Sequence, residues 1–331
     1  MDIPVIDPQS ARLYVLIARA RRRAVVFRRG PTRLVRLLAW NLAKDTIDPG
    51  QWFKGRIYER RCDLSPDGEL LAYFAATHRP PYYSWTAISR PPWLTALVLW
   101  PKGDSWGGGG LFESPLWFKL NHRTTTATAS ASREEKALTT ASRILLGPGQ
   151  PERTDETAVA DGFAVPKRMR VEPLGDRPGW GEDDPICWMR LKRDGWHLVG
   201  DPANARYHGS KGLFGWDFPV PLVIEKNLGA KKSALRLSTH AVFERQGRKY
   251  VQTAALLNAE GGSIDLGRVD WADLDHNGDV LYAAEGCLYR LDPAQAFRGG
   301  TGLAAARLVA DLNDMAFEPI KAPDNATHWR R

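Results

Sequence analysis

The chain has 331 residues, of which 43% are hydrophobic and 25% are charged, so it can bury a core as one large repeat domain or two ordinary domains. Its longest apolar runs fall well short of the roughly 18 residues that a membrane-spanning helix needs. The formal net charge is +8, and the short apolar runs do not predict a membrane-spanning helix.

The first predicted elements are two short apolar runs, Leu13 to Ala18 and Ala24 to Phe27, on either side of a basic turn. Residues 1–61 hold 14 Lys and Arg against 5 Asp and Glu, whereas the rest hold 32 against 33. A concentrated basic face attracts nucleic acid, acidic proteins or anionic surfaces, although a solvated hairpin carries the same charge without a partner. The arginines that we single out as candidate binding residues are Arg19, Arg21, Arg22, Arg23, Arg28 and Arg29.

If this segment is extended, Arg19, Arg21 and Arg23 share one face of a strand. Such a row could contact phosphates, while aromatic side chains nearby stack on bases. The aromatic residues available for this are Trp40, Trp52 and Phe53.

Two later segments repeat one pattern, Asp-Leu-x-x-[Asp/Asn]-Gly-acid-apolar-Leu, beginning at Asp63 and at Asp273. Asp-Gly and Asn-Gly are strong tight-turn signals, because Gly accepts a positive φ and Asn or Asp tolerates it. The two copies start 210 residues apart, which equals five steps of 42. Blades of WD40-type propellers repeat at about 40–45 residues.

Short apolar runs separated by turn residues recur along the chain, at residues 84–89 and 94–100, 187–191 and 196–199, and 241–244 and 249–257. We expect each pair to form a hairpin. Trp106 precedes four consecutive glycines, Gly107 to Gly110. The functional interpretation is a pocket or channel loop in which Trp106 binds a ligand, and the alternative is a flexible connection between blades.

Residues 122–184 depart from this pattern because they are rich in Thr, Ala, Ser, Pro and Gly. We expect an inserted, loop-rich excursion there, with one short helix near Glu134 to Leu145, inside a single propeller domain that spans residues 1–331. The remaining residues, about 270, allow about six blades, with five or seven as the alternatives.

The segment from Asp63 to Tyr73 resembles the strand–turn–strand signature of WD40-like and TolB-like β-propellers, and the turn from Asp273 to Asp279 is similar. The resemblance implies an all-β fold of the propeller type. It implies no particular function, because function depends on the site and not on the fold.

Linear motifs for chemistry are absent from the sequence. Asp273, Asp275 and Asn277 match the first half of a calcium loop, but Ala284 occupies the twelfth position, where the loop needs Glu. We therefore interpret this segment as a blade turn. The seven histidines show no zinc spacing, and no nucleophile elbow occurs. We expect no metal and no cofactor, and we identify no catalytic residue.

The sequence is compatible with three candidate functions. The first is a non-catalytic scaffold that binds a protein or peptide partner, including an acidic one. The second is a propeller-type hydrolase or lactonase with a metal or acid–base site at the channel mouth. The third is nucleic-acid binding through the N-terminal arginines. We expect a cytoplasmic protein that does not bind membranes, because the start of the chain is acidic where a secretory signal is basic, and the three cysteines suggest reduced thiols.

Overall fold

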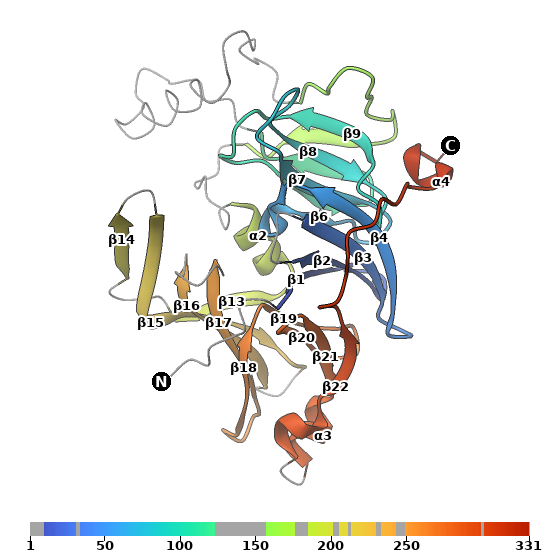
Figure 1. Cartoon of the computed structure of the whole chain (residues 1–331). Helices are drawn as coiled ribbons and strands as arrows, with labels where there is room; N and C mark the ends of the chain where they lie inside the picture. Colours follow the sequence, from blue (N-terminus) through green and yellow to red (C-terminus); the bar gives the residue numbers. More distant parts are fainter. Residues whose placement is uncertain are drawn as a thin grey trace. The chain divides into compact units, whose positions relative to one another are not determined.

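The computed structural model describes residues 10–30, 34–122, 157–175, 185–200, 205–210, 213–229, 233–242, 249–298 and 301–330. These residues form five β-sheets of three to six strands with a few short helices, which confirms the all-β class (Figure 1). The chain clusters into two compact units. Unit 1 comprises Met1–Ile17, Arg22–Pro49 and Leu191–Glu318, and unit 2 comprises Ala18–Arg21, Gly50–Arg190 and Pro319–Arg331.

Two sheets of unit 1 are four-stranded and follow chain order. Sheet A contains β1 (Arg12–Ile17), β2 (Arg23–Arg29), β3 (Leu34–Asn41) and β4 (Thr46–Lys54), whose last residues belong to unit 2. Sheet E contains β19 (Trp271–Leu274), β20 (Val280–Ala284), β21 (Cys287–Leu291) and β22 (Arg307–Asp311). The strands of β2 and β3 are buried along nearly their whole length, which explains their continuous apolar runs.

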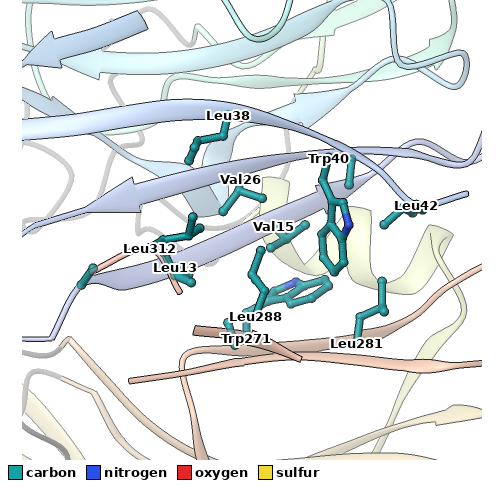
Figure 2. Packing of buried hydrophobic residues seen from close by; sticks show 13 residues of the cluster. Leu13, Val15, Val26, Leu38, Trp40, Leu42, Trp271, Leu281, Leu288 and Leu312 are labelled. Atoms are coloured by element: carbon teal, nitrogen blue, oxygen red, sulfur yellow. The ribbon is translucent and has the colours of Figure 1, made fainter. Parts of the chain in front are cut away.

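The core of unit 1 lies where sheet A faces sheet E. Figure 2 shows side chains from β1, β2 and β3 meeting those of β20 and β21, with Trp40 and Trp271 close to each other. On β1, Leu13 and Val15 point into this core because residues two apart in a strand share a face. Burial of these side chains removes apolar surface from water and is the main stabilising contribution to this unit.

Sheet D, the third sheet of unit 1, has six strands: β13 (Trp196–Gly200), β14 (Arg206–Ser210), β15 (Leu213–Asn227), β16 (Ala234–Val242), β17 (Tyr250–Leu257) and β18 (Ser263–Val269). The long β15 is central to it. Its second half pairs with β13 and its first half with β14, on the side away from β16.

Unit 2 holds the remaining two sheets. Sheet B contains β5 (Arg56–Ile57), β6 (Asp63–Leu64), β7 (Leu71–Ala76), β8 (Ser84–Ser89) and β9 (Ala96–Pro101), and sheet C contains β10 (Gly110–Ser114), β11 (Trp117–Leu120) and β12 (Arg170–Pro173). A second core cluster joins them through Ile88, Trp100, Phe112 and Phe118, all fully buried. Trp100 and Phe118 stack with ring centroids 5.8 Å apart.

The two repeated turns occupy corresponding places. The first joins β6 to β7, after β5 of the same sheet, and the second joins β19 to β20, the first two strands of sheet E. Gly68 and Gly278 have φ values of 73° and 87°, which is the conformation that the turn pattern predicts. Among the described residues, the interval between them contains the first strands of sheets C, D and E, and the number of repeats in it is not established. A closed ring of blades stays a prediction.

One predicted hairpin is wrong. Residues 187–191 belong to helix α2 (Ile186–Arg193), whose buried residues Ile186, Cys187 and Arg190 share one helical face. Gly195, with φ of 94°, follows the helix and donates its N–H to the carbonyl of Lys192 at 3.2 Å. A Gly in the left-handed region after a helix is a common C-terminal stop, and the same residue had suggested a hairpin turn.

The other helical segments are short: η1 (Glu59–Arg61), α3 (Pro293–Phe297), η3 (Gly302–Ala305) and α4 (Asp324–Thr327). Within the described ranges, no helix has the length and apolar character required to cross a bilayer.

The described part of the predicted excursion, residues 157–175, takes part in the core of unit 2. Strand β12 pairs in parallel with β11, and Met169 is buried in the cluster around Trp100. Val159 and Phe163 pack against the same cluster. The helix predicted near Glu134 to Leu145 lies outside the described residues.

Candidate interaction surface

At least three of the six candidate arginines are used inside the fold. Arg28 on β2 is 4% exposed, and its Nε donates to the carbonyl oxygen of Leu312 at 2.9 Å. Arg19 donates to the carbonyl of Phe112 at 2.8 Å. Arg22 donates to the carbonyl of Leu42 at 3.1 Å. These guanidinium groups satisfy main-chain acceptors of neighbouring segments, so their first role is structural.

Arg21 and Arg23 have exposed side chains, and Arg29 is half-buried at the far end of β2. The predicted row of arginines on one strand face is wrong, because residues 18–22 form the turn between β1 and β2 and not an extended strand. Five residues along β2 separate Arg23 from Arg28, or about 17 Å at about 3.4 Å per residue. The six arginines therefore do not form one cluster.

The aromatic residues suggested for base stacking differ in how deeply they are buried. Trp40 is 1% exposed, lies in the core between sheets A and E, and donates its indole N–H to Asp45 at 3.2 Å. It is therefore not available to a nucleic acid, and that part of the prediction is wrong. Trp52 and Phe53 on β4 are half-buried.

The glycine run after Trp106 is a close-packing device. Gly108 and Gly109 have φ values of 88° and 80°, and a Cβ on them would overlap the ring of Phe74 and the carbonyl oxygen of Arg61, respectively. The loop is held by Thr86, whose Oγ1 accepts the N–H of Gly109 at 2.8 Å. Trp106 is 37% exposed at the start of this loop.

The turn that resembles half a calcium loop has its carboxylates engaged with cations. Asp273 pairs with Lys226 at 2.7 Å, and Asp275 pairs with Arg290 at 2.5 Å while accepting the N–H of Asn277 at 2.7 Å. These contacts agree with its interpretation as a turn. Among the described residues, no group of three or more His, Cys, Asp and Glu is arranged to hold a metal ion.

Arg290 on β21 is the centre of a charged network in unit 1. Its guanidinium contacts Asp45 at 2.8 Å, Asp275 at 2.5 Å and Asp279 at 2.7 Å, and also donates to the carbonyl of Leu42 at 3.1 Å. The network ties the β3–β4 turn of sheet A to the β19–β20 turn of sheet E. The side chain of Asp275 is completely buried, so its charge depends on these partners.

The network sets the ionisation of its members. Burial alone would raise the pKa of Asp45, but hydrogen bonds from Arg290 and Arg307 lower it below its usual value. Burial alone would lower the pKa of Arg290, but its three carboxylate partners raise it above its usual value. Both shifts keep the charged forms, as expected of a structural ion network.

A different surface of unit 1 exposes apolar side chains. Of the nine large hydrophobic residues that are exposed in the described ranges, five lie on the adjacent strands β13, β14 and β15. We call these five residues the arm surface: Leu198, Val199, Tyr207, Trp216 and Val220. Their exposed fractions run from 42% to 55%. Single exposed apolar residues are common, but five on strands of one sheet make this part of sheet D a candidate binding surface.

The arm surface follows from the sequence of β15. Pro219 and Pro221 cannot donate ladder hydrogen bonds, and the pairing with β16 is interrupted between Asp217 and Leu222. β14 and the first half of β15 form a ribbon, seen at the left of Figure 1, which β16 joins at Trp216 and Asp217. On it, Tyr207 and Trp216 are directly opposed, with ring centroids 5.0 Å apart.

Comparison of the chain with models of protein families gave no match, and neither did comparison with curated proteins.

Sequence reasoning missed the arm surface. The available signal was Phe218-Pro-Val-Pro221, which places two prolines inside an apolar run. Prolines within a strand indicate an edge or an interrupted ladder, so they predict that this apolar run lies at the margin of a sheet.

Proposed function

We propose that the protein is a non-catalytic interaction module that binds a protein or peptide partner through the arm surface. The observation that supports this is the concentration of exposed apolar side chains on β13, β14 and β15. Tyr and Trp are the residue types that contribute most to binding energy in protein interfaces, because they bury a large area at a low entropic cost. Tyr207 and Trp216, already in contact, form a preorganised pair of this kind.

A second feature gives the partner its chemistry. The exposed side chains of Arg21, in the turn between β1 and β2, and Arg23, the first residue of β2, favour acidic residues on the partner. Exposed charges of this sort raise the association rate more than the affinity. We place this interaction in the cytoplasm, where the three free cysteines would stay reduced.

The experiment compares the wild-type protein with Tyr207→Ser/Trp216→Ser. A partner is recovered with the wild-type protein from the native cell extract, purified, and titrated against each variant by calorimetry. Loss of two central aromatic contacts at about 2 kcal/mol or more each should weaken binding at least about a hundredfold. The matched control is Leu308→Ser, an exposed apolar residue of β22 in the same unit, which should leave the affinity unchanged.

The possible results distinguish binding through the arm surface from its alternatives. Equal binding by the arm variant and the Leu308→Ser control would refute the arm as the binding surface. A wild-type protein that dimerises, and becomes monomeric in the arm variant, would show that the partner is a second copy. Steeply salt-dependent binding to RNA or DNA that Arg21→Glu/Arg23→Glu abolishes would favour the nucleic-acid alternative. Turnover of a test ester or lactone would favour the hydrolase.

A further inference from the structure

Arg90 in unit 2 is a buried arginine at the end of the core between sheets B and C. It is 7% exposed and directly follows β8. Because residues two apart in a strand share a face, Arg90 lies on the same face as Ile88, which is fully buried in that core. A guanidinium stays protonated in proteins, so this position places a positive charge against an apolar cluster.

No acidic side chain pairs with Arg90 within the described part of the chain. Its Nε is buried and has no hydrogen-bond partner. The two carboxylates whose charges act on Arg90 have other partners. Glu69 pairs with Arg330 at 3.2 Å, and Asp67 accepts the hydroxyl of Ser65 at 2.6 Å and the N–H of Glu69 at 3.1 Å. A buried charge without a partner is costly, and such a group calls for a counterion.

Two further arginines lie at this end of the core, because the Leu71–Ser89 pairing places Arg90 beside the segment of Glu69, and Glu69 binds Arg330. Arg168 and Arg330 are exposed, and the guanidinium of Arg168 donates to the carbonyl oxygen of Arg330. Burial lowers the pKa of Arg90, and the charges of Arg330 and Arg168 lower it further, whereas Glu69 and Asp67 raise it. The three cations therefore concentrate positive potential at one place.

A neutral donor lies against the same core cluster. Trp329, next to Arg330 in the chain, packs against the same core cluster as Met169, next to Arg168. The indole N–H of Trp329 is buried and lacks an acceptor in the described structure. The arginines and this indole offer only donors, which is the complement of an acceptor-rich anion.

We propose that Arg90, Arg168 and Arg330 form a binding site for a phosphate group, with the Trp329 indole N–H as an additional donor. Phosphate has acceptor oxygens in a tetrahedral arrangement, and guanidinium forks bind such oxygens in pairs. The three arginines exceed the two carboxylates beside them by one charge, which favours an anion over a neutral ligand. The site uses residues of unit 2 only and does not depend on the arm surface.

The test uses the full chain and inorganic phosphate. Thermal unfolding and calorimetry are recorded with increasing phosphate, and with sodium chloride and sodium acetate at equal ionic strength. Phosphate should raise the midpoint of unfolding in a saturable way, because a ligand that binds only the folded state stabilises it. The same series with a phosphorylated peptide and with its unphosphorylated form distinguishes free phosphate from phosphate carried on a protein.

The variants locate the effect. Arg168→Gln changes an exposed side chain and should weaken phosphate binding by about tenfold or more, since a charge-assisted hydrogen bond is worth about one decade in affinity. Arg79→Gln, an exposed arginine elsewhere in unit 2, is the matched control and should bind as wild type does. Arg90→Met should lose the response to phosphate while unfolding at no lower temperature than wild type without phosphate.

Three results would overturn the site. One is a phosphate response no larger than that of chloride. Another is equal stabilisation by acetate, which would assign the cluster to carboxylates. The third is an unchanged phosphate response in Arg168→Gln. This variant changes only an exposed side chain, so the result can be read even if Arg90→Met does not fold.

Discussion

Arg290→Met should lower the free energy of unfolding by about 3–5 kcal/mol, the range observed when one partner of a buried ion pair is removed. Methionine keeps most of the side-chain length but leaves Asp45, Asp275 and Asp279 without their shared cation. Asp275 suffers most, because its side chain is completely buried. Urea unfolding followed by tryptophan fluorescence measures the loss.

Two companion variants make the result specific. Arg298→Met removes an exposed arginine of the same unit and should stay within about 0.5 kcal/mol of wild type. Arg290→Lys keeps the charge but cannot present a planar fork to several carboxylates, so its loss should be intermediate. If Arg290→Met and Arg298→Met were equally stable, the network would contribute nothing to the fold.

The same network predicts a pH dependence with a definite sign. The pKa of Asp45 is lowered in the folded protein, so its contribution to stability is complete above the unfolded-state value of about 3.9 and declines as the pH falls below it. In Arg290→Met this carboxyl loses its principal partner. The stability difference between wild type and Arg290→Met should therefore narrow below about pH 4. A difference that is constant from pH 7 to pH 3 would contradict this.

Local turn chemistry was the part of the fold most accessible from sequence. The strand predicted at residues 84–89 is β8 with identical bounds, and both Asp/Asn-Gly turns join consecutive strands of antiparallel sheets. These features depend on one or two residues whose backbone preferences are strong. Gly195 shows the limit, because a positive φ serves a helix end as well as a hairpin, and the sequence alone does not choose between them.

The sequence did not predict which partners the charged side chains bind in the folded protein. Arg28 is buried because its acceptors are the carbonyl oxygens of Leu312 and Asn313, nearly the whole chain away. The charge of the N-terminal segment could be counted, but the number of arginines used inside the fold could not. Arg290 and Arg90 gave no sequence signal for the same reason, since their surroundings are built from segments that are distant in the chain.

Tertiary contacts explain why the chain has glycine at residues 107–110. In the sequence, Gly107 to Gly110 suggested either a binding loop or a flexible connection. In the structure, the two central glycines are closely packed and leave no space for a side chain. Gly109 passes directly over the main chain at Arg61, and the guanidinium of Arg61 in turn donates to the carbonyl oxygens of Ser105, at 2.7 Å, and Gly107. The loop and the arginine therefore form one interlocked unit.

Gly109→Ala should consequently destabilise the protein by about 2–5 kcal/mol. Of this, about 1–2 kcal/mol comes from placing an L-residue at φ of 80°, and about 1–3 kcal/mol from the overlap with the carbonyl of Arg61. Gly175→Ala is an unusually close control in the same unit, since its φ is 79° and nothing lies within 4 Å of the added methyl. It should show the backbone cost alone.

The difference between the two variants in urea unfolding therefore measures the contact itself, free of the conformational cost that both share. A difference of about 1–3 kcal/mol is expected for a methyl group forced into a close-packed region. Equal stabilities would mean that the loop at Gly109 can move away from Arg61 without loss, which would restore the interpretation of residues 107–110 as an adaptable binding loop beside the exposed Trp106. Comparing Gly109→Ala with Gly175→Ala therefore decides whether residues 107–110 are a close-packed loop or an adaptable binding loop.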